Sequence, residues 1–411
     1  MNNDKMRVLR FIILPVALLF GARAEVSSQT VEENIEAGRE AFLNYDFGEA
    51  AARYAAARKK ARKNIPAELE ECERQLMKAE NFLERVEKLV ILDSISVPKA
   101  EFFRHFKIPF SSGTLSGAEG LPFAEQDVDY VFTNEGDDFK MWAQPDSTGL
   151  YTIRESIRLT DGQWHEPTVT PEILGNGGNA MYPFMMPDGV TLYYASDNEE
   201  SLGGLDIFVA TRDAADGEYL QPQNIGMPYN SPYDDYLLAI DELNGVGWWA
   251  TDRNQLGDDI TIYVFKVNDL RANYNPEETE DLGAKARLTN WRSTWGDEDY
   301  TALVEEVREI VPGPAEKKGD FIFPMKGGRV YTVLDDFRTA SGRETMKKYL
   351  AAKQTFDGKL SRLGELRRKY ADNRSATLRN QIRTLESETE KDRQTLKRLR
   401  SDVYRAETSR H

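Results

Sequence analysis

The spacing of hydrophobic and polar positions changes along the chain and divides it into three regions. Up to about residue 89, apolar residues recur every three or four positions, which is typical of helices with one buried face. From residue 90 to about 338, short alternating runs separated by Gly, Pro and Asp predict β-strands. From residue 339 onward the helical spacing returns with heptad-like steps. The pattern predicts a multidomain α and β protein with a helical region (25–89), an all-β region (90–338) and C-terminal helices (339–411).

Three helices are expected in the first region. Thr30 and Glu33 form a capping box, Asp46 can start a second helix, and Pro66 fits the first turn of a third. The single cysteine lies in the apolar seam of the third helix, so we expect it to be buried and not to form an internal disulfide. The seam consists of Leu69, Cys72, Leu76, Ala79, Leu83, Val86 and Leu89.

A repeat dominates the β region. The stretch 182–210 alternates apolar and aromatic residues around Asp188-Gly189, a dipeptide that favours two-residue hairpin turns. A second copy follows after a shift of 55 positions, which indicates an array of similar units. The shift superimposes Gly162 on Gly217, Trp164 on Tyr219, Pro167 on Pro222, Tyr193-Tyr194 on Trp248-Trp249, Ser196-Asp197 on Thr251-Asp252, and Ile207-Phe208 on Ile262-Tyr263.

Weaker signals extend the array on both sides. Phe132-Thr133-Asn134 can be aligned with Ala195-Ser196-Asp197 as a degenerate first unit. The segment 321–334 reads as a hairpin, which we place with the strand from Val90 in a last unit that closes the array. An inserted helix is expected near 298–311, capped by Asp297. We expect about five units in all, with four or six as alternatives.

The C-terminal region should form two antiparallel helices that fold back at Asn373, because residues 372–375 favour a turn. One continuous helix in an intermolecular coiled coil is the alternative. Gly358 and Gly364 weaken the first helix, and Thr389 with Asp392 interrupts the apolar stripe of the second.

Charge and targeting signals restrict the function. The net charge is −16, which argues against general nucleic-acid binding, yet residues 341–411 hold 19 Lys and Arg against 10 Asp and Glu. At the N-terminus, a basic segment and a short apolar run precede Ala22-Arg23-Ala24. This pattern predicts a signal peptide (1–24) cleaved after Ala24, with no lipid-attachment cysteine nearby. We expect an exported periplasmic protein without a transmembrane helix in the mature chain.

Few residues suggest catalysis or metal binding. The histidines are His105, His165 and His411, and no Gly-x-Ser-x-Gly nucleophile motif is present. Acidic residues at 197–200 could collect around a metal together with Asp206, but they lack the order of a calcium loop. The glycine-rich stretch 175–178 lacks the Lys-Ser or Lys-Thr of a phosphate loop. We therefore expect no catalytic residues, no cofactor and no metal site.

Paired aromatic residues offer a weaker hint of carbohydrate binding. In a strand, neighbouring side chains point to opposite faces, so at most one member of Tyr193-Tyr194 or of Trp248-Trp249 can face solvent. Core packing is the favoured role for these residues.

The repeat resembles that of TolB-type β-propellers, and the first two helices resemble one tetratricopeptide unit. The propeller resemblance rests on Asp188-Gly189, Ser196 and the motif Gly203-Gly204-x-Asp206, for which it implies structural roles; Met186 replaces the usual Ser. The helical resemblance rests on Gly38, Ala50, Tyr54 and Ala57.

Together these modules are similar to Gram-negative envelope proteins, including a type IX secretion accessory component, although no OmpA-type peptidoglycan-binding pattern is recognisable. The resemblance implies a non-enzymatic periplasmic scaffold with envelope-protein partners, at the outer membrane or cell wall. A propeller hydrolase or a carbohydrate-binding protein is the alternative. The sequence leaves the partner-binding residues unassigned.

Overall fold

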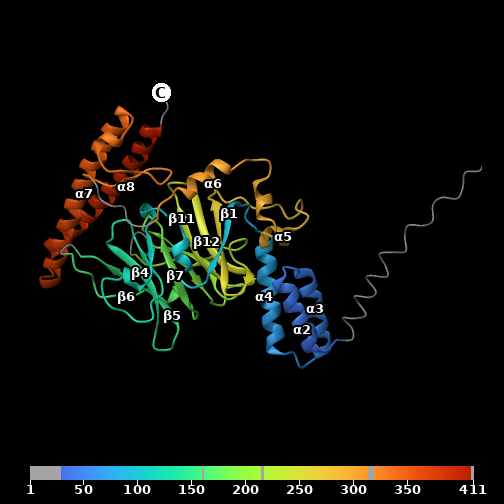
Figure 1. The fold of residues 1–411 in the computed structure, drawn as a ribbon. Helices are drawn as coiled ribbons and strands as arrows, with labels where there is room; N and C mark the ends of the chain where they lie inside the picture. The colour runs from blue at the N-terminus through green and yellow to red at the C-terminus, as the bar shows by residue number, and fades with distance from the viewer. Residues whose placement is uncertain (1–28, 160–161, 214–216, 313–318, 409–411) are drawn as a thin grey trace, which may run out of the picture.

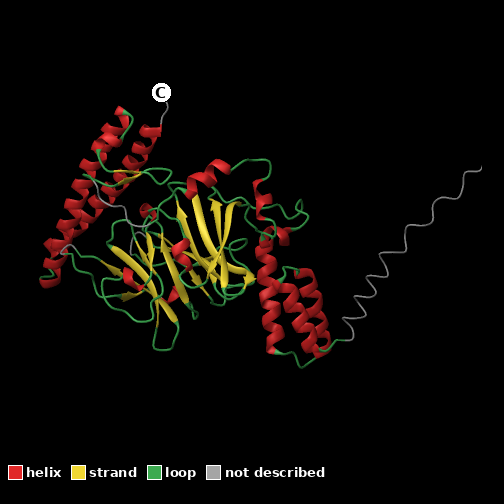
Figure 2. Cartoon of the chain, viewed as in Figure 1, coloured by secondary structure: helices red, strands yellow, loops and turns green. Residues whose placement is uncertain are grey.

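The computed structural model describes residues 29–159, 162–213, 217–312 and 319–408. Within them lie seven α-helices and several antiparallel sheets, arranged as a helical bundle, a sheet region and a long helical pair (Figures 1 and 2). The predicted signal peptide falls outside the described residues. None of the helices in the described part of the chain is long and apolar enough to span a bilayer.

The N-terminal bundle contains α2 (Val31–Leu43), α3 (Phe47–Ala61) and α4 (Ala67–Leu83). The predicted starts are confirmed: Thr30 and Glu33 form a capping box, the Asp46 side chain accepts from the backbone N–H of Glu49, and Pro66 precedes α4. The third helix ends six residues before the last position of the predicted seam, and Val86 and Leu89 are buried in the connection that follows it. Cys72 is buried, as predicted.

This bundle is attached to the sheet region and does not stand apart. Its hydrophobic core takes in Leu202, Met227 and Ala286 from beyond the three helices. The backbone N–H of Glu87 also donates to the carbonyl oxygen of Met227 at 3.0 Å. The three helices therefore pack on the neighbouring sheet region.

Three large antiparallel sheets form the middle of the molecule. The first has the order β2-β3-β4-β5-β6, the second β10-β9-β8-β7 and the third β1-β13-β12-β11. Their strands are β1 (Val90–Pro98), β2 (Thr114–Ser116), β3 (Val131–Thr133), β4 (Phe139–Pro145), β5 (Tyr151–Ile157), β6 (Thr168–Val169), β7 (Ala180–Met185), β8 (Thr191–Ser196), β9 (Asp206–Thr211), β10 (Gln223–Asn224), β11 (Asp235–Asp241), β12 (Val246–Leu256) and β13 (Asp259–Lys266). About five repeat units were expected, and the described residues hold three large sheets.

The 55-residue period corresponds to equivalent strands of successive sheets. Adding 55 to the first residue of β5 gives the first residue of β9, and the same shift takes β6 onto β10. The first unit was misaligned, however. Phe132 and Thr133 belong to β3, the strand before the turn to β4, whereas Ala195 and Ser196 end β8, the strand after the corresponding turn from β7.

The turn at Asp188-Gly189 is longer than predicted. The backbone N–H of Met186 donates to the carbonyl oxygen of Thr191, and that of Gly189 donates to Met186, so four residues separate the paired ends. Gly189 has φ +69° and is the residue of this turn that needs a left-handed backbone. The two-residue turn was wrong because Pro187 holds φ negative at the first turn position, which favours a type I turn followed by glycine.

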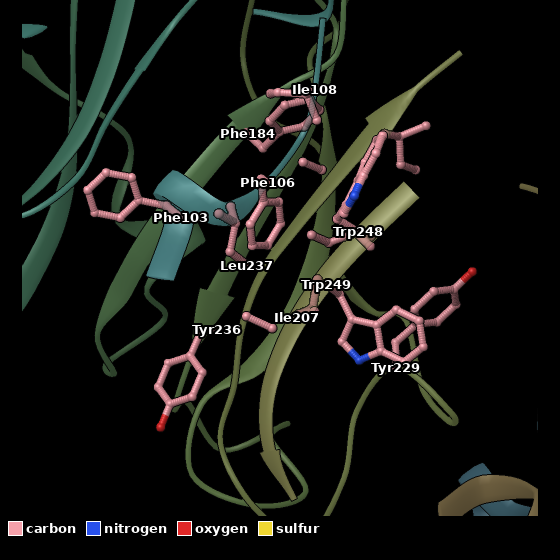
Figure 3. Packing of buried hydrophobic residues seen from close by; sticks show 14 of the residues in the cluster. Phe103, Phe106, Ile108, Phe184, Ile207, Tyr229, Tyr236, Leu237, Trp248 and Trp249 are labelled. Atoms are coloured by element: carbon pink, nitrogen blue, oxygen red, sulfur yellow. The ribbon is translucent and has the colours of Figure 1, made fainter. Parts of the chain in front are cut away.

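One hydrophobic core joins the three large sheets. Strand β11 packs on β7, β8 and β9, while β7 packs on β3, β4 and β5. The segment between β1 and β2 adds Phe102 to this core, and with it Phe103 and Phe106, which Figure 3 shows beside Leu237. Trp248 and Trp249 are both buried, so β12 is covered on both faces. Core packing of these aromatic residues is confirmed.

The third sheet is completed from outside the repeat. Strand β1 pairs with β13, from Val90 opposite Lys266 to Pro98 opposite Asp259. A bulge near Leu92 interrupts the pairing, and there Thr294 accepts from the N–H of Ile91 while Trp295 Nε1 donates to its carbonyl oxygen. The covering segment contains α5 (Leu282–Arg287) and α6 (Thr301–Arg308). The predicted cap at Asp297 was wrong, since Asp299 accepts from the N–H of Thr301.

The C-terminal helices α7 (Ala340–Asp372) and α8 (Ala376–Thr408) pack antiparallel, with Asn373 as the C-cap of α7. The predicted hairpin at Asn373 is confirmed, and neither the glycines nor Thr389 break the helices. Among the described strands, β14 (Phe323–Pro324) and β15 (Val330–Tyr331) pair with each other and join none of the three large sheets. They pack on Met346 and Val403, so their predicted place in a closing unit was wrong.

Candidate functional site

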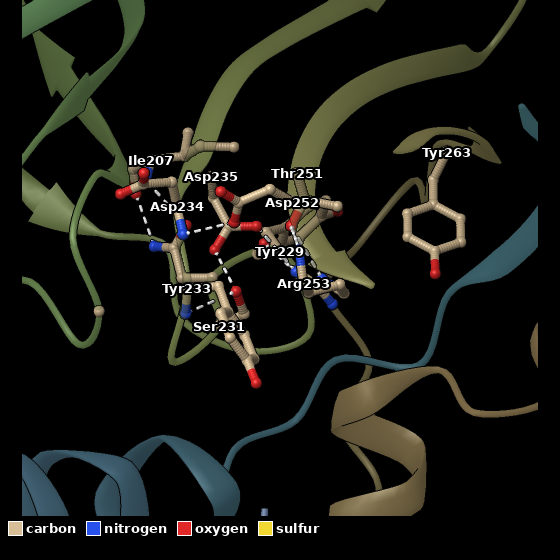
Figure 4. A network of polar contacts seen from close by, with 12 residues as sticks. Ile207, Tyr229, Ser231, Tyr233, Asp234, Asp235, Thr251, Asp252, Arg253 and Tyr263 are labelled. Carbon is tan, nitrogen blue, oxygen red and sulfur yellow. Dashed lines mark hydrogen bonds and ion pairs between the residues drawn. The ribbon is translucent and has the colours of Figure 1, made fainter. Parts of the chain in front are cut away.

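The buried polar side chains of the sheet region gather where the second and third sheets meet the N-terminal bundle (Figure 4). Arg253 lies at the centre, and its side chain is fully buried, as is that of its partner Asp235. Their N–O distance is 3.0 Å. We call Asp206, Ser231, Asp235, Thr251 and Arg253 the joint cluster.

Arg253 uses its donors to tie together three segments. Nε donates to Thr251 at 3.1 Å, and Nη1 donates to the carbonyl oxygen of Ala286 at 3.4 Å. Nη2 donates both to Asp235 and to the carbonyl oxygen of Tyr229. Burial opposes the charge of Arg253, but the surrounding tyrosines and Asp235 raise its pKa. The guanidinium is therefore a permanent structural cation.

Two buried carboxyl groups belong to the joint cluster. Burial raises the pKa of Asp235 to about 6, although Arg253 and the hydroxyl of Ser231 favour its charged form. Burial and the nearby charge of Asp235 raise the pKa of Asp206 to about 8. Three donors oppose this shift: the N–H groups of Leu202 and Gly203, and the amide of Asn224.

The glycines of the repeat motif make room for this cluster. A Cβ on Gly203 would lie 2.4 Å from the carbonyl oxygen of Tyr233. A Cβ on Gly204 would lie 2.0 Å from Asp234 Oδ1. The loop before β9 thus approaches the segment before β11 so closely that a side chain at Gly203 would overlap backbone atoms, and one at Gly204 would require the Asp234 side chain to move.

The remaining motif residues also hold backbone. The Asp188 carboxylate accepts from the N–H groups of Val190 and Thr191, at 2.8 and 2.9 Å. Ser196 is buried, its hydroxyl accepts from Asn198, and its carbonyl oxygen accepts from Ser201. Together with Gly189, all six motif residues form turns or contacts between strands.

The acidic residues considered for metal binding do not converge. Asp197 accepts from the backbone and the side chain of Asn179, both at 2.6 Å, whereas Asp206 is enclosed in the joint cluster. In the described part of the chain no group of three or more His, Cys, Asp or Glu is placed to hold a metal. A Cβ on Gly178 would meet Asp197 and Asn198 within 3 Å, so the stretch 175–178 is closely packed.

The histidines do not mark a catalytic centre in the described residues. His105 and His165 are exposed, and His165 Nδ1 lies 2.7 Å from the carbonyl oxygen of Glu166. Within the part of the chain that the structure describes, no carboxylate or nucleophile is found at hydrogen-bond distance from either ring. His411 lies outside the described residues.

A group of aromatic residues at β3, β7 and β11, one strand from each large sheet, was not predicted from the sequence. Tyr130 immediately precedes β3, Tyr182 lies in β7, and Tyr236 lies in β11. Phe102 contacts Tyr182 and Tyr236, with centroid distances of 5.4 and 5.8 Å, and Tyr130 lies 5.8 Å from Tyr182. The spacing of 52 and 54 residues between these tyrosines was the available signal, but bulges shift it away from 55.

The pH dependence of stability should report on Asp206. An unfolded Asp loses its proton near pH 4, whereas folded Asp206 keeps it until about pH 8. Between these values the folded state binds more protons, so its contribution to stability is lost as the pH rises through 8. We expect the free energy of unfolding in urea to fall by a few kcal/mol between about pH 5 and 8.5.

The variant Asp206→Asn should flatten this decrease. In this variant the side-chain oxygen can take the place of Oδ2 and keep the hydrogen bond from the N–H of Leu202. The amide nitrogen then takes the place of Oδ1, which makes the weaker 3.3 Å contact with the N–H of Gly203. Asp188→Asn, in an exposed turn, is the matched control and should keep the wild-type decrease. Equal decreases in wild type and Asp206→Asn would contradict the prediction.

Comparison with known proteins adds no assignment: no protein-family description, no curated protein and no solved structure matches this chain.

Proposed function

We propose that the protein is a non-enzymatic scaffold of the cell envelope that binds other envelope proteins. One observation carries this proposal: the motif residues and the joint cluster are used to connect strands, sheets and helices. Buried polar groups arranged for catalysis would face a pocket, whereas Arg253 and Asp235 are enclosed by protein.

We infer that the three large sheets are blades of a TolB-type propeller. The equivalence of β5 with β9 and of β6 with β10 supports this inference. So does the position of Phe102 among tyrosines from successive first strands, where a propeller axis would run. The β1–β13 pair corresponds to the closure by which such rings join their ends.

The helices on either side of the sheets are the binding modules in this proposal. Gly38 allows α2 to approach Tyr54 of α3, since a Cβ there would lie 2.3 Å from the Tyr54 ring. This close pair supports the tetratricopeptide-like assignment. Opposite the bundle, α7 and α8 form an arm of two 33-residue helices, each about 50 Å long at 1.5 Å per residue (Figure 1).

We place the mature protein in the periplasm on the basis of the signal-peptide pattern in residues 1–24. The full-length tagged chain should be recovered from the periplasmic fraction, cross-linked to a reproducible set of envelope proteins. A chain lacking residues 2–24 is the matched control and should remain in the cytoplasm without these partners.

Two outcomes would contradict the scaffold. One is recovery of uncross-linked protein alone under gentle cross-linking. The other is turnover of a peptide or glycan substrate that is lost in the His165→Ala variant, which would favour a hydrolase.

A further inference from the structure

The end of the arm is strongly basic. Residues 362–383 contain six arginines and one lysine against two acidic residues. The arginines are Arg362, Arg367, Arg368, Arg374, Arg379 and Arg383, and all six are exposed. We call this segment the arm tip.

The two helices are held together at this end by apolar side chains and not by most of the arginines. Leu363, Leu366 and Ile382 are buried between the helices and form their seam at this end. Arg367 pairs across the arm with Glu386 at 2.8 Å. No ion pair is found within the described residues for Arg362, Arg374, Arg379 or Arg383. Concentrated like charge of this kind destabilises the free chain slightly, which favours a role in binding.

The choice of arginine indicates the chemistry of the ligand. A guanidinium binds carboxylates or phosphates through two parallel hydrogen bonds, whereas lysine acts as a point charge. The four exposed arginines for which no ion pair is found within the described residues therefore fit a surface with several carboxylates.

Such a surface exists on this chain. Residues 275–310 hold ten acidic residues against four basic ones. We call this the acidic segment. It borders a surface hollow of about 450 Å³ lined by Tyr274, Glu278, Glu280 and Asp281, among others. The Tyr274 ring already has Lys88 and Lys285 over it, at 5.4 and 5.6 Å, so it is an established cation contact.

The two charged surfaces cannot meet within one molecule in this arrangement. Figure 1 shows α5 beside the N-terminal bundle and α6 above the sheets, while the turn between α7 and α8 lies at the far end of the arm, on the opposite side of the sheets. A contact between them must join two copies.

We propose that the arm tip binds the acidic segment of a second copy of this chain. The inference deepens the proposed scaffold function and rests on it. The contact joins different surfaces of the two copies, so each added copy leaves one arm tip and one acidic segment free. The product is an open head-to-tail polymer of copies.

Sedimentation velocity of the full mature chain tests this proposal. At about 50 mM NaCl the protein should form species that grow with protein concentration, and at about 500 mM it should be monomeric because salt screens exposed charges. Charge reversal at Arg362→Glu, Arg374→Glu, Arg379→Glu and Arg383→Glu should weaken association by at least about tenfold. The matched control reverses Lys348, Lys391, Lys397 and Arg398, which are exposed cations elsewhere on the arm, and should associate like wild type.

A charge exchange makes the test specific. A chain with Glu277→Arg, Glu278→Arg and Glu280→Arg should also be monomeric alone. Mixed in equal amounts, the two reversed chains should associate again, because each acidic tip meets a basic segment and each basic tip meets an acidic one. Circular dichroism confirms that both variants keep the wild-type helix content.

Three outcomes would overturn the inference: a wild-type chain that stays monomeric at low salt, tip reversal without effect, or a mixture that fails to associate. Binding of the wild-type tip to vesicles with anionic headgroups, without self-association, would assign the tip to lipid instead. Cross-linked envelope partners on a monomeric chain would leave the scaffold proposal standing and remove only this inference. Self-association without any envelope partner would remove the scaffold proposal and leave the contact between copies standing.

Discussion

Arg253→Met is expected to destabilise the protein by about 3–5 kcal/mol. The substitution leaves the Asp235 carboxylate fully buried without its cation and removes a donor from the carbonyl oxygen of Tyr229. An uncompensated buried charge destabilises the protein far more than the intact ion pair stabilises it. In the wild type, the attraction of Arg253 offsets the hydration that the Asp235 carboxylate loses on burial. Urea unfolding followed by tryptophan fluorescence measures the loss as a lower midpoint.

Two further variants make this expectation specific. Arg74→Met removes an exposed cation that pairs with Glu71 along α4, and should cost less than about 1 kcal/mol. The double variant Arg253→Met with Asp235→Leu removes both charges and should recover much of the lost stability. If Arg253→Met costs no more than Arg74→Met, the joint cluster does not hold the sheets and helices together.

Phe102→Ala should also cost about 3–5 kcal/mol, through lost burial and the cavity that remains. Phe102 is 2% exposed and contacts Phe103, Phe106, Tyr182 and Tyr236, so its ring touches side chains from two sheets and from its own segment. Urea unfolding gives the loss in stability. Near-ultraviolet circular dichroism should show a change in the tyrosine environment.

The control is Leu270→Ala, since this leucine is 84% exposed. Its effect should stay within about 0.5 kcal/mol. A similarly small effect of Phe102→Ala would mean that the sheets do not depend on the aromatic group between them, and would weaken the propeller proposal.

Local signals predicted the helices well. Thr30, Asp46 and Asn373 act through residues at most a few positions away, so their roles can be read from the sequence. The arm was predictable for a related reason: its apolar stripe needed a cover, and the turn residues lay between two stretches of similar length. Thr389 and Asp392 did not break α8, because Thr389 bonds to the Glu386 carbonyl oxygen and Asp392 pairs with Lys359.

Pairings between distant segments were predicted less well. The composition of β14 and β15 predicted a hairpin but not the surface on which it packs. That surface contains Met346 of α7 and Val403 of α8, which come together only when the arm folds. The joint cluster was found only in part. Asp206 was identified by its repeat motif, whereas Arg253 looks like an ordinary strand residue until Asp235 and Ala286 are placed around it.

The pairing of β1 with β13 has a consequence for how the chain folds. Val90 leaves the ribosome long before Lys266, its partner in the third sheet. Until then β1 has an unsatisfied edge, and closing so long a loop is slow because its entropy is lost before the contact forms. Unpaired strands of this kind aggregate readily. We therefore expect refolding from urea to be slow and concentration-sensitive, with β1 as the last strand of its sheet to gain hydrogen-exchange protection.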